Sequence, residues 1–524
     1  MKSTLTYLSL FILAFSIICV HACNSNDQSP DKNPNIVFIL ADDMGYGDAG
    51  SYNPDSKIPT PNIDKLASEG IRFTDAHTPA AVCTPTRYGL LTGRYCWRTR
   101  LKKWVILGYD ETPLIESGRE TLGSLLKKSG YETAAIGKWH VGLNWQPKGD
   151  FVFKNDSNKW QNYSGVFKEN EENVDFTKPV TGGPNDLGFD YSFITAGCST
   201  SDNPYCFIEN GKTLGIPSVL IPDKWIGLPG VVTGLMEPSW SMEEVDPIFT
   251  NKAVNFIDEH MKKDPYKPFF LYLALSSPHI PWLPPEMTKG KSEEGPRGDL
   301  VMVVDWAVGE ISKTLSKHGI EDQTMLIFTS DNGPRKGANG HLSAGLLRGY
   351  KGNIWEGGHR VPFIVKWPGR IDPGAVSDQT ISLTDILASF ADLTGQSPGS
   401  IGGEDSYNVL PALLGEQIDG NNERVRVFHS ASGVFAVRKG RWKLIEGTKG
   451  SGSGNISLNE DSLMYSGQLY DIENDPYETN DLFEEQPGIV KELQNILKEK
   501  KNEATGEVAS PEPMLKAVRR ALNN

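Results

Sequence analysis

The chain has 524 residues, of which 66 are acidic and 52 are basic, so its formal net charge at neutral pH is −14. Aromatic residues make up 10% and charged residues 23% of the chain, as in ordinary globular proteins, and the length is enough for more than one structural unit. The acidic balance excludes nucleic acid and anionic membrane surfaces as general partners, but not a small anionic ester bound by a local cluster of positive charge.

The N-terminus predicts an export signal followed by a tether. An apolar run over 5–20 is too short and too near the N-terminus to predict a membrane span, and it ends in Val20-His21-Ala22-Cys23, which resembles a bacterial lipobox. We therefore expect residues 1–22 to be a lipoprotein signal peptide, Cys23 to be lipidated and residues 23–34 to be a polar tether. An ordinary cleaved signal is the alternative. Both predict an exported protein, which is periplasmic or, with the lipid, anchored at the outer membrane.

Short apolar runs alternate with helix-like segments along the rest of the chain. Runs typical of buried strands lie at 35–40, 132–136, 269–275, 325–329 and 361–365. Amphipathic patterns predict helices within 121–129, 250–262 and 299–318. This alternation predicts a parallel sheet covered by helices on both faces, in which ligands bind beyond the carboxyl ends of the strands.

Polar side chains follow four of the predicted strands. In chain order these are Asp42 and Asp43, Lys138 and His140, His279, and Asp331 and Asn332. Any one of them alone is an ordinary polar loop residue, but four strands that deliver such groups to one sheet edge predict a site.

Four of these side chains offer only oxygen ligands, namely Asp42, Asp43, Asp331 and Asn332. Oxygen ligands suit calcium or magnesium rather than zinc, and a shell of six or more ligands favours calcium. The alternative for Asp42 and Asp43 by themselves is a pair of helix N-cap residues. No Cys-x-x-Cys or His-rich cluster in the sequence indicates a zinc site.

The motif that bears most directly on chemistry is Cys83-Thr84-Pro85-Thr86-Arg87, followed by Leu91-Thr92-Gly93-Arg94. A small apolar cysteine beside a turn-forming proline is the structural alternative. The motif resembles the signature of type I sulfatases, whose cysteine is oxidised after translation to formylglycine (3-oxoalanine). The resemblance continues in order through Asp42–Gly45, Gly137–His140, Ser277–His279, Ser330–Gly333, Lys351 and Glu356–Pro362.

The resemblance implies a fold and a division of the chain. It implies an α/β, alkaline-phosphatase-like sandwich with a central, mostly parallel sheet as a catalytic domain over 35–404. It also implies a smaller C-terminal α+β subdomain with an antiparallel sheet over 405–524, to which the segments 440–444 and 469–471 are similar.

The resemblance also implies the nucleophile and the metal ligands. Cys83, as formylglycine hydrate, would attack sulfur, Asp331 would take the attacking proton, and Arg87 would hold the hydrate. The divalent metal, calcium in preference to magnesium, would be held by Asp42, Asp43, residue 83, Asp331 and Asn332. Maturation by a formylglycine-generating enzyme follows from the cysteine form of the signature.

Four further residues receive roles from the same resemblance. Lys138 and Lys351 would bind sulfate oxygens, and His279 together with Lys351 would donate to the departing oxygen. His140 would accept the proton that releases sulfate. The remaining histidines His77, His260, His318 and His429 are interpreted as structural.

The substrate is less well defined by the sequence. An exported, tethered sulfatase with polar specificity loops predicts breakdown of a sulfated glycan, with galactose or N-acetylgalactosamine, perhaps 6-O-sulfated, in a glycosaminoglycan or mucin-type chain. Asn203, Tyr205, Trp282 and His341 are candidate sugar contacts, and packing against the domain is the equal alternative. Arylsulfatase activity on phenolic sulfates, phosphodiester or phosphonate hydrolysis, and non-catalytic glycan binding by a surface lipoprotein are the rival functions.

Two cysteines in the same stretch could pair. Cys198 and Cys206 are close enough in sequence for a loop-closing disulfide, which an oxidising compartment permits, and two buried free thiols are the alternative.

Overall fold

The computed structural model describes residues 33–109, 112–154, 166–399, 402–447 and 467–505. The predicted signal peptide, Cys23 and the tether up to residue 32 lie outside these ranges. Contacts divide the chain into a unit over Met1–Pro34 and a compact unit over Asn35–Asn524, which holds everything described below. Among the described residues, no helix combines the length and apolarity needed to cross a membrane.

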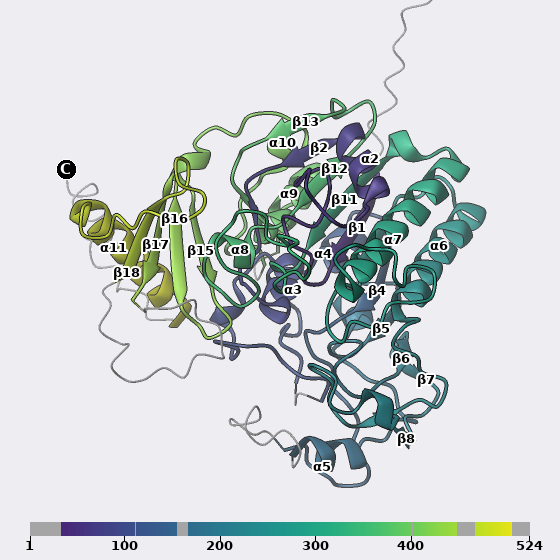
Figure 1. The fold of residues 1–524 in the computed structure, drawn as a ribbon. Coiled ribbons are helices and arrows are strands. Elements are labelled where there is room, and N and C mark those ends of the chain that lie inside the picture. Colours follow the sequence, from purple (N-terminus) through teal and green to yellow (C-terminus); the bar gives the residue numbers. More distant parts are fainter. Residues whose placement is uncertain (1–32, 110–111, 155–165, 400–401, 448–466, 506–524) are drawn as a thin grey trace, which may run out of the picture. The chain divides into compact units, whose positions relative to one another are not determined.

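A mixed sheet of ten strands forms the centre of this unit (Figure 1). Five adjacent strands of this sheet are parallel to one another, in the order β11 (Thr324–Ser330), β1 (Asn35–Ala41), β10 (Phe269–Ala274), β4 (Glu132–Lys138) and β5 (Tyr191–Thr195). One flank continues through β12 (Phe363–Lys366), β2 (Ile71–Phe73) and β13 (Ala375–Ser377), and the other through β6 (Phe207–Glu209) and β7 (Lys212–Leu214).

Both faces of the central strands are buried, which explains their continuous apolar sequences. Successive side chains of β1 point to opposite faces, so Ile36, Phe38 and Leu40 enter one core and Val37, Ile39 and Ala41 enter the other.

Different helices cover the two faces. The core that contains Val37 is closed by α2 (Pro61–Glu69), α6 (Val245–Lys263) and α7 (Pro296–His318). The core that contains Ile36 is closed by α3 (Cys83–Thr92), α4 (Leu122–Lys128), α9 (Ile386–Leu393) and α10 (Leu410–Leu413). Figure 1 shows α6 and α7 side by side along the sheet.

A second, antiparallel sheet follows in the sequence and runs in the order β15 (Val425–His429), β16 (Phe435–Lys439), β17 (Trp442–Glu446) and β18 (Gly467–Asp471). The helix α11 (Pro487–Thr505) packs on β16 and β17 through an apolar cluster that includes Leu493 and Leu497. The expected fold class, a mostly parallel central sheet with a smaller antiparallel sheet, is therefore confirmed.

The second sheet is tied to the first part of the unit by buried ion pairs. On β17, the Nζ atom of Lys443 lies 2.9 Å from Glu356 Oε1 and 2.8 Å from Glu478 Oε1, and all three side chains are fully buried. On β16, Arg438 donates to both carboxylate oxygens of Asp75 at 2.9 and 2.7 Å.

The predicted elements differ from the structure mainly at their ends and in pairing. The helix α6 begins at Val245 rather than 250, and α7 begins at Pro296, where a proline fits the first turn because no backbone N–H is needed there. The last predicted strand, β12, runs antiparallel to β11. The strands β5, β6 and β7 lie in a Gly- and Asn-rich stretch without a clear strand pattern, and we did not predict them.

Candidate active site

The four predicted strand ends meet at one edge of the central sheet. Because β11, β1, β10 and β4 are parallel neighbours, their carboxyl ends lie together. Backbone hydrogen bonds fix the turns that follow: Asp42 N donates to Ser277 O at 3.0 Å, and Asp331 N donates to Ala41 O at 3.0 Å. The structure thus brings together the residues that the sequence pattern placed at this edge.

Cys83 is the first residue of α3, so it lies at the positive end of a ten-residue helix. Arg87 lies one turn further along the same helix face, fully buried. Its Nε and Nη2 atoms donate to Asp331 Oδ2 at 2.9 and 2.7 Å, and Nη1 donates to the backbone oxygen of Lys138 at 2.7 Å. The guanidinium therefore joins the ends of two strands beside Cys83.

Each of the three buried aspartates at the edge has a cationic partner. Asp331 pairs with Arg87, Asp42 pairs with Lys138, and Asp43 Oδ1 lies 2.5 Å from Lys351 Nζ. Burial alone would lower the pKa of Lys138, but the interactions with Asp42, Cys198 and Cys83 together hold the pKa well above its usual value.

Three oxygen atoms of this group have no hydrogen-bond donor within the described part of the chain. They are Asp42 Oδ1, Asp43 Oδ2 and Asn332 Oδ1, and all three are buried. Burial, together with the nearby carboxylate of Asp42, also raises the pKa of Asp331 to about 8. Unsatisfied buried oxygens and crowded carboxylates are what a hard divalent cation would satisfy, so the residues fit the predicted metal.

Two histidines face the same space with defined tautomers. The Nε2 atom of His140 lies 2.9 Å from the backbone oxygen of Ile106, and the Nδ1 atom of His279 lies 2.8 Å from that of Ile280. A carbonyl accepts only from N–H, so the other ring nitrogens, His140 Nδ1 and His279 Nε2, carry the lone pairs. Burial first, and then repulsion by Lys351, lowers the pKa of His279 to about 4.

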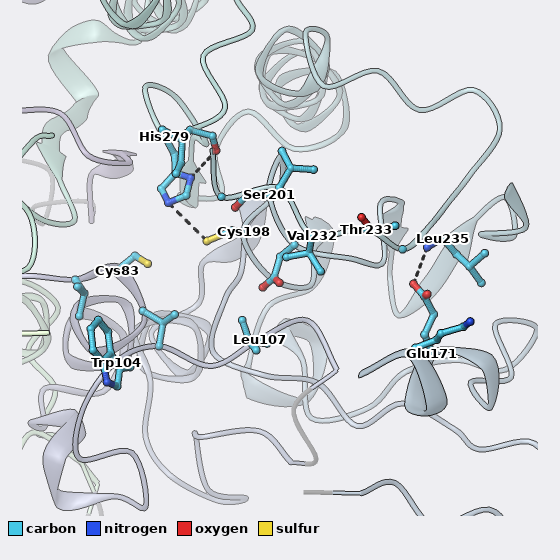
Figure 2. Close-up of a pocket in the computed structure, with 18 of the residues that line it drawn as sticks. Cys83, Trp104, Leu107, Glu171, Cys198, Ser201, Val232, Thr233, Leu235 and His279 are labelled. Atoms are coloured by element: carbon cyan, nitrogen blue, oxygen red, sulfur yellow. Dashed lines mark hydrogen bonds between the residues drawn. The ribbon is translucent and has the colours of Figure 1, made fainter. Parts of the chain in front are cut away.

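A thiol that the sequence did not predict at the site lies between these groups. Cys198 Sγ is 3.9 Å from His279 Nε2 (Figure 2). It is also 3.7 Å from Nδ1 and 3.8 Å from Nε2 of His140. Cys198 and Cys206 are both free buried thiols, so the disulfide alternative is excluded. The missing signal was β5: Cys198 lies three residues after Thr195, the end of a strand that we did not predict.

Three residues at the site have left-handed backbone conformations. The φ angles are 67° at Asp43, 63° at Trp104 and 55° at His140, a region that residues other than glycine rarely adopt. Such conformations persist only where the surrounding structure imposes them, and they cluster at functional sites.

These side chains open into a pocket of about 910 Å³ (Figure 2). Cys83, Cys198, His279, Arg335 and Lys351 line its polar end. Apolar side chains form much of the remaining wall, and they are Val82, Trp104, Val105, Leu107, Leu220, Val231, Val232, Leu235 and Ile280. The charged residues Lys168, Glu171, Glu172 and Asp202 also line it, and Ser201, Gly230, Thr233 and Gly234 complete the lining.

None of the four candidate sugar contacts lines this pocket. The hydroxyl of Tyr205 donates to Val232 O at 2.7 Å, and His341 Nε2 lies 2.8 Å from Asp48 Oδ1 in a buried network. Asn203 donates to the pocket residue Glu171 at 2.7 Å. Trp282 is half-buried, and its Nε1 atom has no hydrogen-bond partner within the described part of the chain. The geometry therefore favours the packing alternative for Tyr205 and His341 and leaves sugar binding by the other two a prediction.

The four histidines interpreted as structural each make a hydrogen bond or an ion pair and do not line the pocket. His77, together with His359, lies in the buried network of Asp75 and Glu356, and His260 lies 2.8 Å from Glu132. His318 pairs with Asp258, and His429 Nδ1 lies 3.0 Å from Ser430 O.

Comparison with known proteins assigns the chain. The profile of the sulfatase family matches residues 34–396, and the profile described as "N-sulphoglucosamine sulphohydrolase, C-terminal" matches residues 350–505. The chain belongs to the sulfatase family. It is therefore a sulfuric ester hydrolase.

Relatives of this sulfatase include a bacterial and a human enzyme. It is 33% identical to N-acetylgalactosamine-6-O-sulfatase of Bacteroides thetaiotaomicron, over 92% of this chain and 96% of the relative. It is 33% identical to human arylsulfatase A, over 89% of this chain and 87% of the relative. A solved sulfatase structure from a study of glycosaminoglycan metabolism by Bacteroides thetaiotaomicron superposes with a TM-score of 0.75 and 32% identity, over 90% of this chain and all of that one.

Proposed function

We infer that this sulfatase removes 6-O-sulfate from N-acetylgalactosamine or galactose in a sulfated glycan, after Cys83 is converted to formylglycine. The observation that carries the chemistry is the set of three buried aspartate–cation pairs around Cys83, with three carboxylate and amide oxygens left for a metal. The sugar is supported by the N-acetylgalactosamine-6-O-sulfatase that matches this chain over nearly its whole length.

Formylglycine and a divalent metal would complete this site. Formylglycine supplies a hydrated aldehyde as nucleophile, and a calcium ion held by Asp42, Asp43, Asp331, Asn332 and residue 83 supplies positive charge beside it. The remaining catalytic work falls to the side chains of the chain itself.

Lys138 and Lys351 bind the sulfate group. Both ammonium groups are kept protonated by their aspartate partners, and both lie beside Cys83, at the positive end of α3. Fixed cations and a helix N-terminus beside the monoanionic sulfate group stabilise the charge that shifts between oxygens during the reaction.

Proton transfers are assigned by the positions of the lone pairs. Arg87 holds Asp331 in place by two hydrogen bonds, so that the Asp331 carboxylate accepts the proton of the attacking hydroxyl. His140, whose lone pair is on Nδ1, accepts the proton whose removal releases sulfate. Lys351 lines the pocket and donates to the departing sugar oxygen, and His279 Nε2 assists when it carries a proton.

The pocket fits a sugar ring with one apolar face. Trp104 and Leu107 offer apolar surface, while Glu171 and Asp202 offer carboxylate oxygens that accept hydrogen bonds from hydroxyl groups. The exported and lipid-anchored location remains part of this proposal, and it rests on the sequence of the first 23 residues.

A panel of substrates tests the proposal. The chain is produced together with a formylglycine-generating enzyme, and a loss of about 18 mass units at Cys83 verifies conversion. Sulfate release is then compared for 6-O- and 4-O-sulfated N-acetylgalactosamine, 6-O-sulfated galactose, a phenolic sulfate and a phosphonate monoester. We expect kcat/KM to be highest for a 6-O-sulfated sugar and no turnover by Cys83→Ala.

The other outcomes identify the rival functions. A phenolic sulfate as the best substrate would make the chain an arylsulfatase, and a phosphonate monoester as the best substrate would make it a phosphonate hydrolase. A converted chain that binds sulfated sugars without turnover would be a glycan-binding protein.

A further inference from the structure

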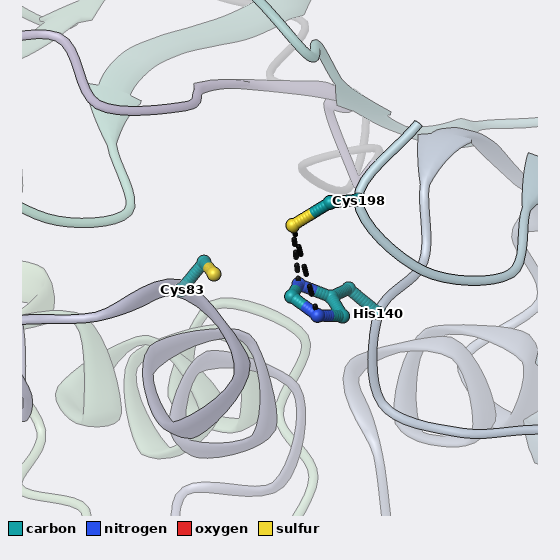
Figure 3. A group of neighbouring side chains, drawn as sticks. All are labelled: Cys83, His140 and Cys198. Atoms are coloured by element: carbon teal, nitrogen blue, oxygen red, sulfur yellow. Dashed lines mark hydrogen bonds between the residues drawn. The ribbon is translucent and has the colours of Figure 1, made fainter. Parts of the chain in front are cut away.

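The unconverted chain places two thiols and one imidazole around one point, with a second imidazole beside one of the thiols. Cys83 Sγ, Cys198 Sγ and a ring nitrogen of His140 all lie within 4.8 Å of one another, and all three residues are buried (Figure 3). His279 Nε2 adds a second imidazole nitrogen 3.9 Å from Cys198 Sγ. In Figure 3 the sulfur atoms of Cys83 and Cys198 face the space beside the ring of His140.

We propose that the chain that retains the Cys83 thiol binds a zinc-type divalent cation through Cys83, Cys198, His140 and His279. This site shares residue 83 with the proposed calcium site, but none of its ligands is an aspartate. Conversion of Cys83 to formylglycine removes one of the two thiolates of the zinc site. Only this loss of the site on conversion rests on the proposed function.

The distances agree with tetrahedral coordination. Bonds of about 2.3 Å to sulfur and about 2.0 Å to nitrogen separate a sulfur ligand from a nitrogen ligand by about 3.5 Å. The observed separations from Cys198 Sγ are 3.7 Å to His140 Nδ1 and 3.9 Å to His279 Nε2. Shifts of a few tenths of an ångström therefore complete these two edges, and two thiolates with two imidazoles are the ligand set of many structural zinc sites.

The hydrogen bonds of both histidines fix the tautomer that a metal ligand needs. In zinc sites the ligating imidazole donates its other ring N–H to a carbonyl or carboxylate. His140 does this through Nε2 to Ile106 O, at 2.9 Å, and His279 does it through Nδ1 to Ile280 O, at 2.8 Å. The free nitrogen of His279 faces Cys198, whereas Cys198 Sγ lies 3.7 Å from Nδ1 and 3.8 Å from Nε2 of His140, so the His140 ring must turn to direct its Nδ1 lone pair at the ion.

The charges also permit the ion. The nearby cations Arg87, Lys138 and Lys351 are each paired with an aspartate, which reduces their repulsion of the ion. Binding releases one proton from each of the two thiols, and the two thiolates balance the charge of Zn²⁺. The pocket that Cys83, Cys198 and His279 line is the route of entry.

Cobalt serves as the spectroscopic probe. The full chain is produced without a formylglycine-generating enzyme, its unmodified Cys83 is verified by mass, and Co²⁺ is added in the presence of a phosphine reductant. We expect the intense visible bands of tetrahedral cobalt and a near-ultraviolet sulfur-to-cobalt charge-transfer band, both abolished by one equivalent of Zn²⁺. The weak bands of six-coordinate cobalt without charge transfer would place the ion on the aspartates and overturn the proposal.

Variants assign the ligands. Cys198→Ser should lose about half of the charge-transfer intensity and weaken zinc binding by more than about 100-fold, beyond the loss typical of outer partners. Cys206→Ser, the same change at a buried thiol that does not line the pocket, should bind as the parent does. His279→Gln should alter the visible bands and keep both thiolate contributions. Equal binding by the Cys198 and Cys206 variants would refute the site. Because no step needs turnover, failure here is distinct from failure to hydrolyse a sulfate ester.

Discussion

Replacement of Lys443 by methionine should destabilise the fold by removing the cation from a buried cluster. The Lys443 ammonium is fully buried and contacts Glu356 Oε1 at 2.9 Å, Glu478 Oε1 at 2.8 Å and His359 Nε2 at 3.0 Å. Loss of one partner from a buried ion pair costs about 3–5 kcal/mol, because a charge is left without compensation. Glu356 keeps its ion pair with Arg360 at 3.3 Å, so only Glu478 loses its cationic partner. We therefore expect a loss of unfolding free energy at the lower end of this range, about 3 kcal/mol.

Urea unfolding of the Lys443→Met and Lys439→Met variants measures this effect. Lys439, on the neighbouring strand, makes partly exposed ion pairs with Glu423 and Glu492, and loss of such pairs costs about 0–1 kcal/mol. The two variants share the same chemical change, so the difference between them isolates the buried cluster. Equal free energies of unfolding for both variants would refute the reasoning.

The pH dependence adds a second check on the same variant. Burial raises the pKa of Glu478 to about 7 even with Lys443 present, and removal of the ammonium can only raise it further. When the pKa of a carboxyl is higher in the folded than in the unfolded chain, the free energy of unfolding falls as the pH rises above the unfolded pKa of about 4.3. The deficit of Lys443→Met should therefore be smaller at pH 5 than at pH 8, and a deficit that grows on acidification would contradict this account.

Three further results are expected. Arg438, Arg360 and His77 outweigh burial and hold the pKa of Asp75 well below its usual value, so Asp75→Asn should lose stability at pH 7, by about 3 kcal/mol. In acid-unfolding curves the deficit should begin to shrink below about pH 4 and vanish only once the pH falls below the lowered pKa of Asp75. Removal of the metal by a chelator that prefers calcium should abolish sulfate release from the converted enzyme, and calcium should restore it more fully than magnesium, as sulfate assays would show; restoration by zinc alone would contradict the oxygen site. Lys351→Ala should lower kcat by about 10²–10⁴-fold for a sugar sulfate and much less for a sulfate with a more acidic leaving group, whereas an equal loss for both would refute proton donation by Lys351.

The sequence predicted the part of the fold in which burial on both faces imposes an unbroken apolar pattern. The unbroken apolar run at 35–40 predicted a buried central strand. Because ligands bind beyond the carboxyl ends of parallel strands, Asp42 and Asp43, which follow this strand, were predicted to lie at the site. The strands β5 to β7 were missed because they are short and lie among residues that favour turns. The direction of β12 is set by its antiparallel pairing with β11, and the local sequence does not indicate the direction of a strand.

Whether a site residue could be predicted depended on whether it directly follows a strand or lies on a loop. Groups that directly follow predicted strands, such as Lys138 and His140, were placed at the sheet edge from their position alone. Cys198 and Trp104 reach the pocket from loops whose course depends on tertiary packing, and no periodic pattern marks such residues. His341 and Tyr205 were candidates by residue type, but their polar atoms are used by buried neighbours.

The left-handed conformations of Asp43, Trp104 and His140 bear on how the enzyme should fail when heated. Conformations of this kind cost of order 1–3 kcal/mol each and are maintained only by the strands and loops around them. Local openings that relieve this cost need less energy than global unfolding, so they occur at lower temperature. Sulfate release should therefore decline several degrees below the temperature at which the helices and strands melt, and a stabilised core alone would not raise the working temperature of the enzyme.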